Sequence, residues 1–152
     1  MISRPTTDVL VEDCCRELTE EILPVIEDET LKLRLIMTVT VLGNAAVRAA
    51  HEIAWMRDET TTLLTFAQSV AAAHGDDRLG PAIDEVAAAP RDSLHLADVT
   101  DVYERAGHAF DVALQVAQQF GAAELITRAA EVLRARIETE KTVMGGYAVV
   151  GR

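Results

Sequence analysis

The sequence predicts an all-α fold, an antiparallel helical bundle of four long helices plus one short helix, in a single domain over residues 1–152. Apolar residues recur at helical spacing over long stretches, and hardly any stretch shows the strict alternation of a half-buried strand. Strong helix formers such as Ala, Leu and Glu are abundant. The 152 residues, 49% hydrophobic and 26% charged, suit one globular domain with a core of its own.

The first helical segment is expected over about residues 7–23. Pro5 and Thr6 give a start signal, since proline favours the first turn of a helix and threonine its cap. Apolar residues then recur every four positions along one face: Leu10, Cys14, Leu18 and Ile22. Pro24 ends or kinks this segment, because its ring removes a backbone donor.

A second helical segment is expected over about residues 30–57. The acidic residues 27–29 stand just before it, where the positive end of a helix dipole favours anions. Residues 35–47 form the longest weakly polar run, 13 residues against the roughly 20 that a membrane span needs. Because the segment is apolar nearly all round, we predict a buried core helix at the centre of the bundle.

Two further segments precede the C-terminal half. One covers about residues 59–73, and residues 74–77 supply its stop and turn. Its apolar side consists of Leu63, Phe66 or Ala67, and Val70. A short segment follows over residues 80–88, and residues 89–93 form a surface loop because they combine a proline with two capping residues.

The C-terminal half carries the most regular pattern. Its first segment places apolar residues at alternating steps of four and three, the spacing of helices that cross at about 20° in bundles. These are Val99, Tyr103, Ala106, Phe110, Ala113, Ala117 and Phe120. Gly121 ends that segment, and the last one, residues 122–144, repeats the rule. Its apolar positions are Ile126, Ala130, Leu133, Ile137 and Met144, and its solvated face pairs Glu124 with Arg128, Arg134 with Glu138, and Arg136 with Glu140.

The charge balance excludes two classes of partner. Lys and Arg number 14 against 25 Asp and Glu, and the net charge of −11 repels nucleic acid phosphates and anionic membrane surfaces. No basic and apolar secretory signal opens the sequence, so we expect a cytoplasmic protein that starts near Met1. Cys14 and Cys15 diverge by about 100° on a helix, which predicts reduced, partly buried thiols, with an intersubunit or metal contact as the alternative.

We expect no catalytic constellation, no metal and no cofactor. His51-Glu52 resembles the start of a zinc-protease helix, but Trp55 occupies the position of the second histidine ligand. The paired Glu-x-x-His motifs of di-iron bundles and the glycine-rich phosphate loops are lacking. His95 with Asp92 is more typical of helix capping than of an oriented base. An enzyme that uses His51 and Glu52 as acid and base has the least support.

One polar stripe stands out in the second segment. Asn44, Arg48, His51 and Trp55 follow steps of four, three and four along one face, with Glu52 beside them. One interpretation is a satisfied polar network, in which Arg48 pairs with Glu52 and Asn44 bonds a neighbouring helix. Another is a protein-partner surface, because Arg and Trp are enriched in interface hot spots. A small-molecule site is the third.

The N-terminal third also resembles a known family. Residues 4–6 (Arg-Pro-Thr) open a helix, residues 21–24 (Glu-Ile-Leu-Pro) close it, and a long helix follows with Asn44 and, eight residues on, Glu52. Over residues 4–57 this pattern resembles small bacterial helical proteins of unassigned domain function, encoded beside aminoglycoside-phosphotransferase-like kinases and acyl-CoA-dehydrogenase-like enzymes. The resemblance implies the accessory subunit of a kinase that phosphorylates 4-hydroxyacyl-CoA, whose phosphate the dehydrogenase-like enzyme then eliminates.

We therefore expect a non-catalytic accessory or partner subunit of a phosphotransferase-type kinase in hydroxyacyl-CoA or acyl-CoA metabolism. Its expected contact residues are Asn44, Arg48, His51, Glu52 and Trp55. The alternative is a homodimeric bundle that binds a small apolar ligand, of acyl or sterol type, between its helices. Residues 145–152 form an apolar tail that is disordered, docks on its own domain or docks on a partner subunit.

Overall fold

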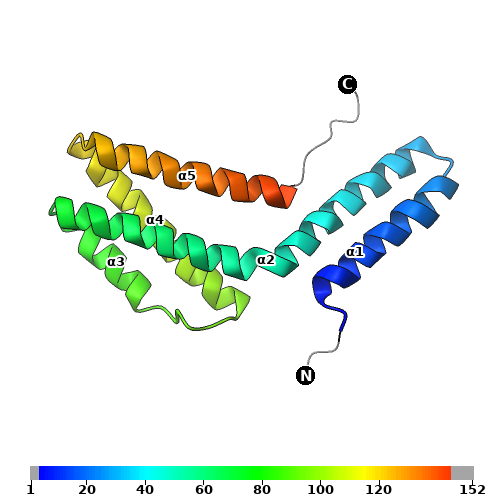
Figure 1. Ribbon diagram of the computed structural model, residues 1–152, viewed down its shortest axis with the longest axis horizontal. Helices are drawn as coiled ribbons and strands as arrows, with labels where there is room; N and C mark the ends of the chain where they lie inside the picture. The colour runs from blue at the N-terminus through cyan, green and yellow to red at the C-terminus, as the bar shows by residue number, and fades with distance from the viewer. Residues whose placement is uncertain (1–3, 145–152) are drawn as a thin grey trace. The chain divides into compact units, whose positions relative to one another are not determined.

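The computed structural model describes residues 4–144, so the predicted tail lies outside the described residues. The described chain contains helices and no strand (Figure 1). The α-helices are α1 (Thr7–Glu17), α2 (Glu29–Ala73), α3 (Leu79–Ala87), α4 (Leu96–Gln119) and α5 (Ala123–Met144). Four are long and one is short, which confirms the predicted all-α helical bundle. A π-helical turn, Leu18–Ile22, and a 3-10 turn, Leu23–Val25, follow α1.

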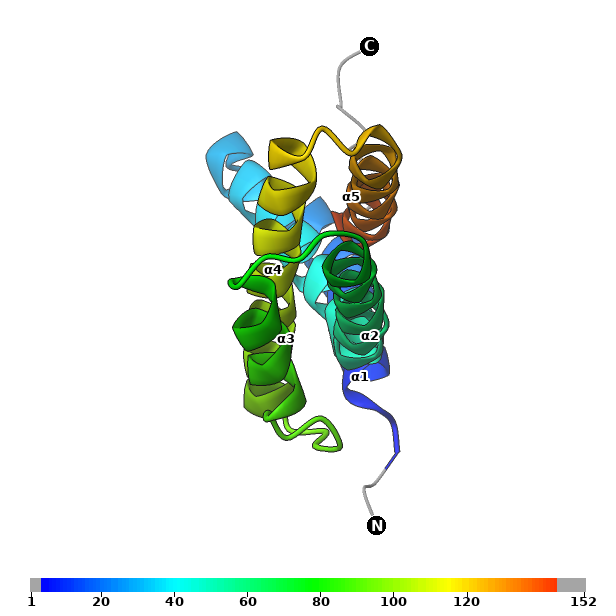
Figure 2. The same cartoon turned by 90° about the vertical axis from the view of Figure 1, so that its left-hand side faces the viewer.

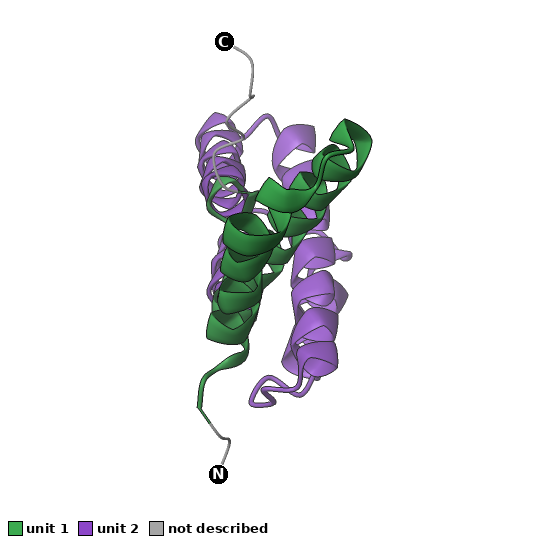
Figure 3. Ribbon diagram, turned by 90° about the vertical axis from the view of Figure 1, so that its right-hand side faces the viewer, with its two compact units in different colours: residues 1–52, 141–152 green, residues 53–140 purple. Residues whose placement is uncertain are grey.

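The chain divides into two compact units (Figure 3). Unit 1 comprises Met1–Glu52 and Lys141–Arg152, and unit 2 comprises Ile53–Glu140. The division falls inside α2, so the first half of this helix belongs to unit 1 and the second half to unit 2. The single domain expected from composition stays a prediction.

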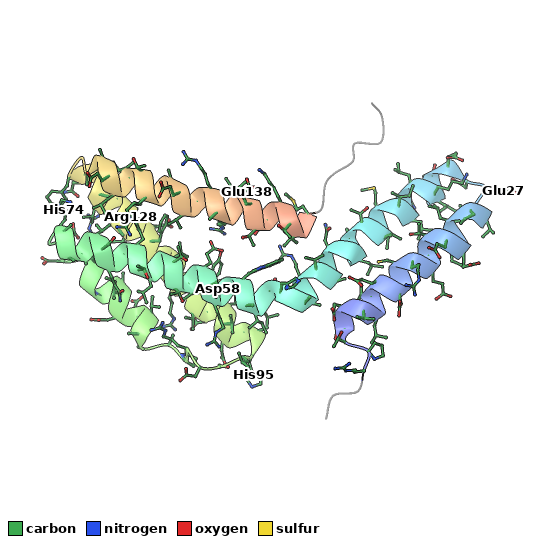
Figure 4. The ribbon with its side chains drawn as sticks, viewed as in Figure 1. Glu27, Asp58, His74, His95, Arg128 and Glu138 are labelled. Carbon is green, nitrogen blue, oxygen red and sulfur yellow. The ribbon has the colours of Figure 1, made fainter. Side chains whose placement is uncertain are left out.

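In unit 1, α1 and the first half of α2 run antiparallel as a helical hairpin, residues 4–52 (Figure 1). Glu27 lies at the turn of the hairpin (Figure 4). As predicted, the first helix ends around Pro24, and the backbone becomes extended at Ile26. Asp28 then caps α2, because its Oδ1 accepts the backbone N–H groups of Thr30 at 2.7 Å and Leu31 at 3.1 Å.

The segments predicted over residues 30–57 and 59–73 are one helix. Neither glycine nor proline occurs between Gly43 and Gly75, so nothing in the sequence interrupts the helical hydrogen bonds. The helix ends at Ala73, immediately before the predicted stop at residues 74–77.

The expectation that residues 35–47 form a buried core helix is wrong. Ala46 is the one buried residue of this run, and several of its apolar side chains are more than 40% exposed. Within unit 1, this half of α2 packs against α1 on one side. Its other sides have no neighbouring helix within the described part of the unit, so their apolar side chains are exposed.

Unit 2 packs the second half of α2 with α3, α4 and α5 around one core (Figure 2). The residues predicted for the core face of α2 are buried: Leu63, Phe66, Ala67 and Val70. So are most of those predicted for α4: Val99, Ala106, Phe110, Ala113 and Ala117. Tyr103 is half-buried, whereas Phe120 is exposed and stacks on His74, with ring centroids 4.8 Å apart. Gly121 ends α4 with a φ of 63°, as a helix-terminating glycine does.

The inner face of α5 differs from the predicted one. Leu133 and Ile137 are exposed. Ile126 packs against the core as predicted, but the other residues that pack there are Leu125, Ala129 and Val132. The observed row is one residue earlier, a rotation of about 100°. Both rows are apolar, and the buried row contains the small Ala129, which lets the helix approach its neighbours closely.

Candidate functional site

A single seam holds the hairpin together. Side chains that are at least partly buried recur at steps of three and four on both helices: Val11, Cys15 and Leu18 on the first, and Leu35, Val39, Leu42 and Ala46 on α2. The Cys15 thiol donates a hydrogen bond to the Val39 carbonyl oxygen, with sulfur and oxygen 3.7 Å apart. Burial raises the pKa of this thiol. Both cysteines are free thiols, as expected, but Cys14 is exposed rather than partly buried.

The opposite side of α2 carries a row of exposed apolar side chains. Leu33, Met37 and Val41 follow at steps of four and are 59%, 62% and 66% exposed. Since each helical residue advances by about 100°, this row lies across the helix from the seam. Leu31 and Ile36 are also exposed, so the first half of α2 is apolar on nearly every side.

The first helix also presents apolar side chains to solvent. Its exposed large apolar residues, including those of the two turns after it, are Val9, Leu10, Ile22 and Val25. Of the four residues whose spacing predicted this helix, Leu10, Cys14 and Ile22 are exposed and Leu18 is partly buried. That row therefore lies mainly on the outside of the hairpin.

By length and composition, α2 could cross a membrane, and among residues 4–144 it is the only helix that meets this test. An 18-residue window of it has a mean hydropathy of 1.3, and 6% of that window is buried. The core helix of a soluble protein passes the same test but is mostly buried. The first half of α2 is therefore as apolar as a buried helix, although most of its side chains are exposed.

The exposed row of α2 continues into the polar stripe that the sequence predicted. From Val41, steps of three, four and three lead to Asn44, Arg48 and His51. Asn44 is half-buried, and the other two are exposed. Arg48 Nη1 donates to Glu52 Oε1 at 2.8 Å, which confirms the predicted pair between residues four apart.

Trp55, the last residue of the predicted stripe, belongs to unit 2. It is half-buried and lines a cleft of about 220 Å³ between α2 and α5. Glu59 Oε1 is buried at this cleft and lies 3.5 Å from Arg136 Nε. The Arg136 guanidinium stands 5.8 Å from the ring centroid of Tyr103. Burial, reinforced by the charge of Glu59, raises the pKa of Tyr103 to about 12.

Sequence reasoning missed this cluster, because Arg136 was assigned to a solvated pair with Glu140. A signal was present nonetheless. Glu59 stands four residues before Leu63, at the head of the row that continues through Phe66 and Val70. A carboxylate in a core row needs a partner, and a cation on a neighbouring helix supplies it.

A second cleft in unit 2, of about 270 Å³, is lined by Arg57, Arg91 and Ser93 among others. The Ser93 hydroxyl donates to Asp98 Oδ2 at 2.6 Å and accepts the backbone N–H of His95 at 3.2 Å. Ser93 therefore supports the start of α4, where Figure 4 places His95. The N-cap residue, His95, has no side-chain capping hydrogen bond, so the capping expected of His95 and Asp92 is not observed at the start of α4.

Among residues 4–144, no group of three or more His, Cys, Asp or Glu side chains is placed to hold a metal ion. Comparison of the chain with protein-family models, with curated proteins and with solved structures finds no match.

Proposed function

We propose that this protein is a non-catalytic subunit that acts by assembling with other chains, with the hairpin as its main contact surface. The exposed row of Leu33, Met37 and Val41 carries this proposal. A helix that is apolar on all sides is ordinarily buried, and burying each such side chain fully is worth about 1.5–3 kcal/mol. Large contiguous apolar surfaces on a soluble chain mark interaction sites.

The partner enzyme that we propose is a kinase of the aminoglycoside-phosphotransferase type, acting in hydroxyacyl-CoA metabolism. The resemblance of residues 4–57 to accessory subunits of such kinases supports this choice. The polar stripe of Asn44, Arg48, His51, Glu52 and Trp55 is the proposed contact with the kinase. Its residue types suit that role, since arginine and tryptophan dominate interface hot spots.

Reconstitution with the kinase tests the proposal. The kinase is purified alone and with this protein, and phosphorylation of a 4-hydroxyacyl-CoA is measured in both preparations. We expect a stable complex and higher activity in its presence. Arg48→Ala and Trp55→Ala should each weaken the complex about 10-fold or more, whereas Arg91→Ala, at an exposed arginine of unit 2, should not. Unchanged affinity in both stripe variants, with normal thermal unfolding, would exclude the stripe as the contact.

The alternative function, binding of an apolar ligand between helices, has less support. The cleft at Arg57 and Ser93 is lined mainly by charged and hydroxyl-bearing side chains, and the cleft at Trp55 also contains Asp58, Glu59 and Arg136. A thermal-shift screen over acyl-CoAs, fatty acids and sterols tests this alternative. A concentration-dependent rise in Tm would establish an apolar site, because a ligand that binds only the folded state stabilises it.

A further inference from the structure

We infer that the hairpin pairs with the hairpin of a second copy of this chain, so that two helical hairpins form one four-helix bundle. The inference rests on the proposed function as an assembly subunit, and it names the chain that covers the apolar surface. The kinase contact proposed above uses the polar continuation of the same helix, which leaves the apolar row for the second copy.

The amount of exposed surface fits a dimer. Nine large apolar side chains of the hairpin are between 38% and 72% exposed. They lie on several faces of both helices, and an interface that takes roughly 800 Å² from each partner would draw on the ones that share a face. A second copy offers the same area, because a two-fold interface uses one patch twice.

The geometry of the exposed row fits helix pairing. Leu33, Met37 and Val41 form a ridge about 12 Å long that is inclined to the axis of α2, because they follow at steps of four. In bundles whose helices cross at about 20°, four-step ridges of one helix pack with three-step ridges of its neighbour. A two-helix hairpin of this size cannot enclose a core alone, and pairing with another hairpin gives each helix a second neighbour.

Charge also favours a second copy. Arg34 lies two helical turns before Val41 on the same side of α2, and it forms no ion pair within the described part of the chain. The first helix and its turns carry exposed carboxylates, among them Glu12, Glu17 and Glu20. In a pair of hairpins, the first helix of one copy can supply carboxylates to Arg34 of the other.

The same charges oppose a membrane as the cover. An inserted hairpin would carry the acidic tip at residues 27–29, the carboxylates of the first helix and Arg34 into hydrocarbon. Each of these groups is costly to bury there. Between two copies, in contrast, the acidic tips remain in water at the rim.

Sedimentation velocity of the full-length protein over a range of concentrations tests the inference. We expect a species of twice the monomer mass of 16.5 kDa. Met37→Glu and Val41→Glu should each weaken this dimer about 100-fold or more, because symmetry places every substitution in the interface twice. The matched control is Leu94→Glu, an apolar residue of unit 2 that is 65% exposed, and it should leave the dimer intact.

A wild-type monomer at every concentration would overturn the inference, as would a dimer that resists both hairpin substitutions. A monomer that floats with phosphatidylcholine and phosphatidylglycerol vesicles would overturn it in favour of a membrane. Since a charged residue could also unfold the hairpin, a photo-crosslinking amino acid at Val41 provides a second test in a folded chain. Crosslinks to residues 4–52 of another copy support the dimer, and crosslinks to unit 2 alone refute it.

The two proposals fail separately. A monomer that binds the kinase through the hairpin refutes the second copy and keeps the subunit function. A hairpin dimer that neither binds nor activates the kinase refutes the kinase and keeps the dimer.

Discussion

The hairpin and unit 2 are both rich in apolar residues, yet they bury them to very different extents. Of the buried hydrophobic residues in the described chain, all but Ala46 and Val143 belong to unit 2. Each long helix of unit 2 has several neighbours, whereas the two helices of the hairpin share one seam. The spacing of apolar residues predicts which faces of a helix are stabilised by burial against another element. Whether those faces are buried within one chain depends on how many of its helices pack around them.

The largest effect that would sharpen this comparison is expected from Phe66→Ala. Phe66 is 2% exposed and its ring lies 5.0 Å from that of Phe110, so truncation leaves a cavity at the centre of unit 2. We expect a loss of about 3–5 kcal/mol in the free energy of unfolding, measured by urea denaturation followed by circular dichroism. Leu94→Ala, at an exposed site, should change it by less than about 0.5 kcal/mol. Equal effects would show that unit 2 lacks the well-packed core described.

The sequence predicted the core of unit 2 well where one apolar row had no competitor. On the second half of α2, the row through Leu63 and Val70 is flanked by threonines and other polar residues, so its buried face was unambiguous. On α5, two adjacent rows are apolar, and spacing alone could not choose between Ala129 and Ala130. In the hairpin, the apolar character of residues 35–47 was read correctly, but burial depends on neighbours that local sequence does not specify.

The candidate site was predictable only where contacts are local. Arg48 and Glu52 are four residues apart on one helix, so their pairing follows from helical geometry. Glu59 and Arg136 are far apart in the sequence, and their contact exists because α2 and α5 pack together. For Arg136, spacing predicted a local pair with Glu140, whereas the contact with Glu59 follows only from the fold.

The second-largest effect is expected at this long-range pair in unit 2. Arg136→Met removes the partner of Glu59 and leaves a largely buried carboxylate, which should cost about 1–2 kcal/mol of unfolding free energy. Adding Glu59→Gln should restore part of the loss, because the uncompensated charge is gone. A double-mutant cycle by thermal unfolding measures the coupling. Strictly additive effects would mean that the two side chains do not interact.

In the hairpin, a smaller effect is expected from the cap of α2. Asp28→Ala removes the acceptor for the Thr30 and Leu31 backbone N–H groups and should cost about 1 kcal/mol. Hydrogen exchange is the measurement: amides at the start of α2 should exchange faster, and those of α4 should not change. Asp28→Asn retains an acceptor and serves as the control. Faster exchange throughout unit 2 would show that the effect of the cap is not confined to the hairpin.

The smallest effect at neutral pH is expected from Tyr103→Phe, but it should grow in alkali. The pKa of Tyr103 is raised to about 12 by burial and by the charge of Glu59, whereas an unfolded tyrosine ionises near pH 10. Between these values the unfolded chain releases a proton that the folded chain keeps, so stability falls as pH rises. Tyr103→Phe should lack this part of the decline. Tyrosinate absorbance in a Tyr147→Phe background reports Tyr103 alone, since the chain has 2 tyrosines, and a midpoint near pH 10 would show that the Glu59 cluster does not act on it.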